Sequence, residues 1–283
     1  MNGQRRLQKL ERVETVARRE IVAAMRRARG DVAEKIAKAG RDKGIVTSER
    51  RRRAAFSAIG GYYDRLEREI TAIIEDTAYG AARMFHEEAV EDIRAARGRV
   101  AQAVVLFDRR RVDAIWAVVA PENGQNLAAV FTKKMEQEEI RNLRTALVET
   151  WRIGDLEGLT LQERHRELQK RWDQLAGNTL ADRFVDRAGR KWKNADYLNM
   201  LTRTTCARVA RDTYFDVLIK AGDDLAIIEN VDGDACEVCA EWDGKVISIT
   251  GRTAGYPSYA KAIAVGWGHP NCRCTAERWE EEA

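Results

Sequence analysis

The chain has 283 residues, of which 45% are hydrophobic and 33% charged, and its 49 basic and 45 acidic side chains leave a formal net charge of +4. This length allows two ordinary domains with sound cores, and the balanced charge excludes a DNA-coating polycation, which gathers its basic residues on one face. No apolar run approaches the ~20 residues that span a bilayer, and the basic N-terminus lacks the apolar core of a secretory signal, so we expect cytoplasmic synthesis and no membrane partner.

The first part of the chain shows the spacing of long amphipathic helices. Apolar residues recur at three- and four-residue steps from Arg5 to about Ala28, and Gly30 is expected to end or bend this helix. A second helix begins near Ser48, which can cap it. The pair Gly60-Gly61 is a candidate interruption of this second helix.

Further helices are marked off by three local signals. Helical spacing persists to Ala120, and Pro121 predicts a boundary because proline disfavours helix in the residue before it. The sequence Thr160-Leu161-Gln162-Glu163 matches the capping box at a helix start. A last long helix is expected from Asp196 to Ala221, closed by Gly222.

The remaining C-terminal sequence favours β structure. Leu225 to Val231 is apolar and rich in isoleucine, Val246 to Ile249 is β-branched, and Asp243-Gly244 between them is a turn signal. We therefore expect a mostly α protein with a small α+β C-terminal module. A helical body would span residues 1–177 and the module 178–283, ending in a Cys/His-stabilised β finger at 234–275.

Four of the five cysteines fall in the last fifth of the chain, as two close pairs. In a protein made in the cytosol, such grouping favours metal ligation over disulfides. Cys236 and Cys239 have the C-x2-C spacing that lets two thiolates reach one tetrahedral ion. The sequence predicts a structural zinc (Zn²⁺) site of Cys236, Cys239, His269 and Cys272, with Cys274 as a substitute, because an extended backbone points residues two apart to one face.

Two other interpretations of these residues stay open. The cysteines can be small buried thiols in a finger that folds without metal, since free cysteines pack as small hydrophobes. A disulfide would form if the protein later met an oxidising medium. In each case Trp242 and Trp267 are expected to pack a finger too small to have its own core.

The same motifs resemble those of the phage Mu F-like minor head proteins, the phage head morphogenesis family. The turn is Asp234-Ala235-Cys236 through Cys239 to Asp243-Gly244-Lys245, and the chain then carries His269-Pro270-Asn271-Cys272-Arg273-Cys274. A preceding helix element, R-T-E-like in that family, is here Arg203-Thr204-Thr205, with a threonine where the pattern has an acid. The resemblance covers roughly residues 180–277.

This resemblance implies a non-enzymatic minor capsid protein of a tailed phage or prophage. It would be located in the virion, at the portal vertex or in the capsid interior, and act in head assembly or in genome packaging and delivery. The implied partners are the portal protein and the major capsid or scaffold proteins, with packaged DNA as a further contact and no small-molecule substrate. Because amphipathic helices pack readily in grooves, the helical body is expected to dock on the portal or capsid.

A first alternative is a zinc-knuckle nucleic-acid-binding protein. Zinc knuckles bind single strands by stacking bases on aromatic rings beside basic groups, and the finger carries Trp242, Lys245 and Arg273. The candidate phosphate contacts outside the finger are Arg50, Arg51, Arg52 and Arg53. The simpler interpretation of these four arginines is one turn of a solvated helix start.

A second alternative is a zinc-dependent hydrolase or deaminase. His86-Glu87-Glu88 supplies the H-x-E of the deaminase signature, whose other half is P-C-x-x-C. However, His86 precedes Cys236 by 150 positions, and Ala235 stands where the signature has proline. We therefore expect no enzyme.

Overall fold

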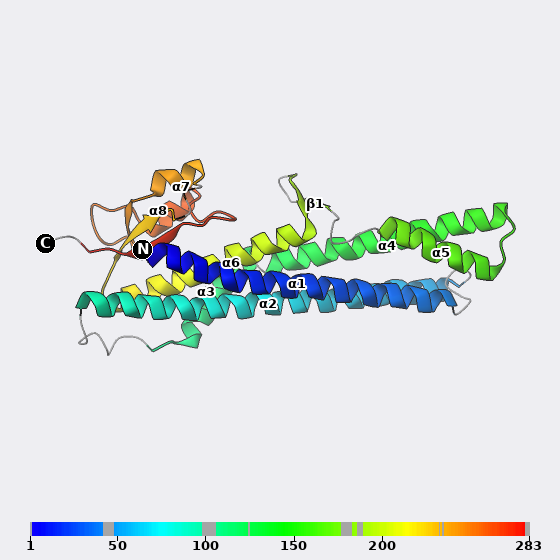
Figure 1. The fold of residues 1–283 in the computed structure, drawn as a ribbon, viewed down its shortest axis with the longest axis horizontal. Helices are drawn as coiled ribbons and strands as arrows, with labels where there is room; N and C mark the ends of the chain where they lie inside the picture. The colour runs from blue at the N-terminus through cyan, green and yellow to red at the C-terminus, as the bar shows by residue number, and fades with distance from the viewer. Residues whose placement is uncertain are drawn as a thin grey trace. The chain divides into compact units, whose positions relative to one another are not determined.

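Helices make up most of the structure, a computed structural model that describes residues 2–41, 48–97, 106–123, 125–176, 183–185, 189–231, 233 and 235–280. The longer helices are α1 (Asn2–Arg41), α2 (Glu49–Arg97), α3 (Arg109–Asn123), α4 (Gln125–Leu156), α5 (Leu161–Ala176) and α6 (Asn194–Lys220) (Figure 1). The shorter elements are β1 (Arg183–Val185), β2 (Lys191–Lys193), β3 (Leu225–Glu229), α7 (Glu237–Trp242), β4 (Val246–Ser248), α8 (Tyr259–Ala264) and β5 (Thr275–Arg278). The prediction of a mostly α protein with a small α+β C-terminal module is confirmed.

The chain divides into two compact units, each built from separate stretches. Unit 1 comprises Met1–Arg18, Ile73–Asn126 and Asn199–Ala283, and unit 2 comprises Arg19–Ala72 and Leu127–Leu198. The expected domain junction at residues 177 and 178 lies outside the described residues. The division into a body and a module therefore stays a prediction.

Unit 2 is a helical assembly with a β1–β2 antiparallel hairpin. Its core is formed by apolar side chains at helical spacing on several helices: Ile21, Met25, Val32, Ile36, Ile59, Tyr63, Leu66, Ile70, Phe131, Leu143, Leu168 and Trp172. Burial of such stripes is the main source of helix stability in proteins. The sequence therefore forms these helices through one shared apolar core.

The expected breaks at glycine were wrong. Gly30 lies inside α1, and Gly60-Gly61 lies inside α2. The buried stripes continue past these positions, with Val32 on α1 and Tyr63 on α2, and this burial outweighs the roughly 1 kcal/mol that a helical glycine costs. Gly60 also allows a close approach, because a Cβ there would lie 3.1 Å from a carboxylate oxygen of Glu136.

The break predicted at Ala120-Pro121 lies three residues early. Pro121 falls in the last turn of α3, which ends at Asn123, and α4 begins at Gln125. Only two residues of α3 follow the proline. The predicted helix boundary is therefore present, but it lies three residues further along the chain. The helical spacing expected to persist to Ala120 is interrupted, because α2 ends at Arg97, residues 106–108 are not helical and α3 begins at Arg109. Residues 98–105 lie outside the described residues.

The capping box at the start of α5 is confirmed. The Thr160 backbone N–H donates to Glu163 Oε2 at 2.8 Å, and the Glu163 N–H donates to Thr160 Oγ1 at 3.3 Å.

We expect Thr160→Ala to lower the free energy of unfolding by about 1 kcal/mol, because it removes this cap. Urea titration measures the change, and Gln162→Ala in the same exposed turn is the matched control. Equal effects of the two substitutions would contradict a capping role.

Unit 1 contains the three-stranded antiparallel sheet, in which β3 lies between β4 and β5. The two predicted strands are confirmed, and so is the end of α6, where Gly222 adopts a φ of +84° and Asp223 N–H donates to the Leu218 carbonyl at 2.9 Å. Strand β5 and the short helices α7 and α8 were not predicted. None of the described helices carries an apolar stretch able to cross a membrane.

The start of α1 lies beside this sheet (Figure 1). Arg6 is fully buried, forms an ion pair with Asp92 of α2 and donates to the Ala276 carbonyl of β5 at 3.1 Å. Its guanidinium lies 3.6 Å from Glu88 and stacks over the Tyr214 ring at 4.5 Å. One buried cation therefore joins α1, α2, α6 and β5.

Candidate metal centre

The first arm of the candidate centre is the C-x2-C turn at α7. Cys236 is the N-cap of α7, and its sulfur accepts the backbone N–H of Cys239 at 3.4 Å. Cys239 lies in the first turn and is buried. After α7, Gly244 turns the chain into β4 at a φ of +72°, which glycine adopts without strain. Asp234 lies outside the described residues.

The second arm is the segment from His269 to Cys274, which leads into β5. A turn closes it, because the Cys272 N–H donates to the His269 carbonyl at 2.9 Å. Asn271 within this turn has a φ of +66°, a conformation that asparagine tolerates better than most residues. Its N–H donates to Thr204 Oγ1 of α6 at 3.3 Å. The second arm is thus tied to the helix that carries Arg203-Thr204-Thr205.

The two arms bring sulfur and nitrogen atoms to the spacing of a tetrahedral ion. His269 Nε2 lies 3.1 Å from Cys236 Sγ and 3.3 Å from Cys239 Sγ, and the Cys239 and Cys272 sulfurs are 3.6 Å apart. Zinc bonds of about 2.3 Å to sulfur and about 2.0 Å to nitrogen place tetrahedral ligand atoms roughly 3.5–3.8 Å apart. The two sulfur–nitrogen spacings are slightly shorter than this, so the ligand atoms would move apart by a few tenths of an ångström around an ion. With that adjustment, Cys236, Cys239 and His269 offer a donor set that suits zinc.

All five predicted residues meet in two overlapping groups. Cys236, Cys239 and His269 form one, and Cys239, Cys272 and Cys274 form the other, with ligand atoms within 4.8 Å of one another in each. Cys239 belongs to both groups. Without Cys239, neither group keeps three ligand atoms.

Burial and hydrogen bonds shift the pKa values of the cluster in opposite directions, and burial raises the pKa of the Cys239 thiol to about 12. The Nδ1 atom of His269 lies 2.8 Å from the Pro270 carbonyl, to which it can only donate, so the lone pair of Nε2 faces the sulfurs. The N–H of Cys239 lowers the pKa of the Cys236 thiol. A hydrogen bond from Cys274 lowers the pKa of Cys272 to about 5. Two thiols are thus biased toward the thiolate, the form that binds metal.

A buried arginine supports the cluster from α6. Arg211 stacks over the Trp267 ring at 4.4 Å, and its Nε donates to the Tyr259 hydroxyl at 3.2 Å. Its positive charge also contributes to the low pKa of Cys272. Trp242 and Trp267 are both buried, which confirms their predicted role in packing. The finger thus relies on a few large side chains rather than on a core of its own.

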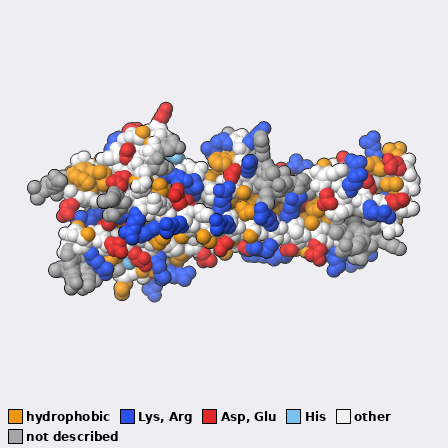
Figure 2. Space-filling view, viewed as in Figure 1, with side chains coloured by type: hydrophobic (Ala, Val, Ile, Leu, Met, Phe, Trp, Pro, Cys, Tyr) orange, Lys and Arg blue, Asp and Glu red, His pale blue; other side chains and the backbone are white. Residues whose placement is uncertain are grey.

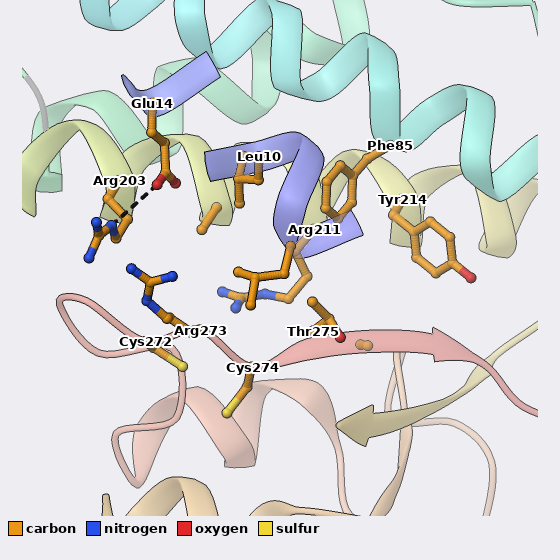
Figure 3. A pocket seen from close by; sticks show the side chains of 13 residues that line it. Leu10, Glu14, Phe85, Arg203, Arg211, Tyr214, Cys272, Arg273, Cys274 and Thr275 are labelled. Atoms are coloured by element: carbon orange, nitrogen blue, oxygen red, sulfur yellow. Dashed lines mark hydrogen bonds and ion pairs between the residues drawn. The ribbon is translucent and has the colours of Figure 1, made fainter. Parts of the chain in front are cut away.

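Carboxylates from α1 meet the arginines of both motifs. Glu14 pairs with Arg203 at 3.2 Å, the dashed line in Figure 3, and Glu11 pairs with Arg273. Thr205, which occupies the place of the expected acid, is fully buried. The acid beside Arg203 is therefore supplied from 189 positions away in the chain, which no local motif could predict.

Glu14 makes this region sensitive to pH. Burial raises its pKa to about 7, against the lowering effect of Arg203. Because the pKa of Glu14 is higher in the folded protein than the value near 4.5 in the unfolded chain, the protonated side chain stabilises the fold. This stabilisation is complete below pH 4.5 and is lost as the pH rises through 7.

Relative to Glu14→Gln, the wild-type free energy of unfolding should therefore fall by about 3 kcal/mol between pH 4.5 and 8. Urea titrations across this range test it; Glu20→Gln, at an exposed position, should leave the profile unchanged.

The residues of the deaminase alternative do not join the cluster. His86 is buried on α2 and packs edge-on against Phe107 at 5.4 Å, and burial lowers its pKa. Glu88, the acid of the H-x-E string, forms ion pairs with Arg6 and Lys9. Both side chains thus have structural contacts in unit 1, away from the two groups of metal-ligand atoms.

The four arginines Arg50 to Arg53 lie in the first turn of α2. Consecutive helical residues point about 100° apart, so the four cannot share one face, and Arg53 pairs with Glu49 of the same helix. Over the face drawn in Figure 2, basic and acidic side chains are interspersed. A phosphate-binding site formed by all four arginines together stays a prediction. The different directions of the four side chains do not favour such a site.

The fold and the site define a mostly helical protein whose small C-terminal module carries a cysteine and histidine cluster. The family model described as phage minor capsid protein 2 matches residues 49–279. The chain belongs to this family and is a phage head protein, as the motifs predicted. No curated protein and no solved structure gives a significant match. The match begins at α2, so the carboxylates that α1 supplies lie outside it.

Proposed function

We propose that this phage head protein is a structural, non-enzymatic component of the virion, located at the portal vertex or in the capsid interior. Its partners would be the portal and the major capsid or scaffold proteins, and its role would be in head assembly or in genome packaging and delivery. Residues 1–177 would provide docking helices, and residues 178–283 a module held by one zinc ion. The family match supports the virion location, and the helical composition of the chain supports docking.

The observation that carries the zinc proposal is the convergence of the two arms on the nitrogen of His269. That atom lies within 3.3 Å of both C-x2-C sulfurs, although 30 residues of chain separate it from Cys239. Zinc would fix the α7 turn to the segment that enters β5, through Cys236, Cys239, His269 and either Cys272 or Cys274. Its contribution would be folding energy rather than catalysis.

Metal analysis of the purified protein, paired with thiol titration before and after chelation, tests this proposal. We expect about one zinc per chain and thiols that become reactive only after chelation. Heads assembled from the phage's own head genes should contain the protein, measured by quantitative mass spectrometry. Five freely reactive thiols without metal would overturn the zinc proposal, and absence of the chain from assembled heads would overturn the assembly role.

A further inference from the structure

A groove in unit 2 runs between the start of α2 and the second half of α4. Its lining includes Arg52 and Phe56 from α2 and Arg144, Val148, Trp151 and Arg152 from α4, and its volume is about 750 Å³. This volume lies within the range of about 300–1,000 Å³ that is typical of binding pockets. Its lining belongs to unit 2, whereas the cysteine cluster belongs to unit 1.

The floor of this groove is apolar and open to solvent. Val148 is 68% exposed and Trp151 is 45% exposed, and Leu147 lines the groove beside them. Single exposed apolar residues are common on proteins, but a hollow that gathers several aliphatic and aromatic side chains marks an interaction site. A partner that inserts an apolar side chain here would remove this surface from water.

The rim of the groove is positively charged. Three arginines line it, and no acidic side chain is among the described residues of the lining. Carboxylates that flank the groove in sequence have other partners: Glu49 pairs with Arg53, Glu149 with Arg171 and Asp155 with Arg164. Guanidinium groups bind carboxylates with two parallel hydrogen bonds, so the rim is complementary to an acidic partner.

The aromatic rings of the groove are poorly placed for binding nucleic acid. The guanidinium of Arg144 lies over the Phe56 ring at 5.2 Å, and that of Arg164 lies over the Trp151 ring at 5.1 Å. Single-stranded nucleic acids bind by stacking bases on such ring faces. Because a guanidinium already covers a face of each ring and the rest of the floor is aliphatic, the site favours an inserted apolar side chain.

We propose that this groove, which we call the Arg/Trp groove, binds an acidic amphipathic helix of another phage head protein. An apolar residue of that helix would enter between Val148 and Trp151, and flanking Asp or Glu side chains would pair with Arg144 and Arg152. Arginine and tryptophan are the residue types that most often dominate binding energy at interfaces. The proposal rests on the role in head assembly proposed above and names the surface that serves it.

A photo-crosslinking amino acid at position 148 tests the occupant in heads assembled from the phage's own head genes. We expect a crosslink to an apolar residue of another head protein, with Asp or Glu within one helical turn of it. The same probe at Val118 of α3, which is 59% exposed, should not give that crosslink. A crosslink to DNA, to a second copy of this chain or to a segment without acids, or no crosslink at all, would overturn the proposal.

Charge reversal at the groove tests this surface separately from the proposed role in head assembly. Arg144→Glu with Arg152→Glu should reduce the amount of the chain in heads by about tenfold or more, since one tenfold step needs only about 1.4 kcal/mol of binding energy. Arg19→Glu with Arg68→Glu, at exposed positions of the same unit, changes the net charge equally and should have little effect; thermal melting verifies that both variants fold. Equal incorporation of both variants would refute the groove but leave the head role intact, whereas absence of the wild type from heads would refute the head role itself.

Discussion

Replacing Cys239 with serine is expected to abolish zinc binding and unfold the C-terminal module. Cys239 belongs to both groups of ligand atoms, so its loss leaves each group with only two. A structural zinc ion contributes on the order of 10 kcal/mol of folding free energy, more than the whole stability of many domains. Zinc content, measured by mass spectrometry of the eluted metal, should fall from about one equivalent to none, with loss of the module's thermal transition.

The matched control for Cys239→Ser is Cys206→Ala. Cys206 is fully buried in α6 and belongs to neither group, so its loss removes a thiol without touching the centre. This variant should keep its zinc and lose only about 1 kcal/mol to the small cavity. Comparison of Cys272→Ser with Cys274→Ser then identifies the fourth ligand as the position whose change releases zinc. Full zinc retention by Cys239→Ser would refute the centre described here.

Replacing Arg6 with methionine is expected to destabilise unit 1 by about 3 kcal/mol, because the half-buried Asp92 and the buried Glu88 lose the cation between them. Asp92 would be left beside an apolar side chain, Glu88 would keep only its ion pair with Lys9, and Tyr214 would lose the guanidinium stacked on its ring. Urea titration followed by the near-ultraviolet circular dichroism of the aromatic residues measures the loss. The effect should be large although the position lies outside the family match.

Arg5→Met is the control for Arg6, since Arg5 is the exposed neighbour on the same turn. It should change stability by less than about 0.5 kcal/mol. Adding Asp92→Asn to Arg6→Met should recover part of the loss, because one of the stranded charges is then removed. If Arg5→Met and Arg6→Met destabilise the protein equally, the buried network does not carry the attachment of α1 to the sheet.

Local patterns in the sequence were enough for most of the secondary structure. Helical spacing predicted the long helices, the capping box at Thr160 predicted the start of α5, and Gly222 predicted the end of α6. These features could be predicted because each of them depends on residues within one or two helical turns. Strand β5 was missed, because its sequence Thr275-Ala276-Glu277-Arg278 has neither the apolar run of β3 nor the consecutive β-branched residues of β4. The glycine breaks failed because burial from other helices outweighed a local preference.

The helical class, the five candidate ligands and the phage head family could be predicted from the amino-acid sequence, because spacing in short motifs carries that information. The folded structure was needed to see that Cys239 is shared by both ligand groups, that Glu14 faces Arg203, and that Arg6 is buried beside carboxylates. It also gathered Arg52, Arg144 and Arg152 around one groove. These contacts join residues up to 270 positions apart, and in a sequence one buried arginine or glutamate looks the same as the many that face solvent on a charged helix.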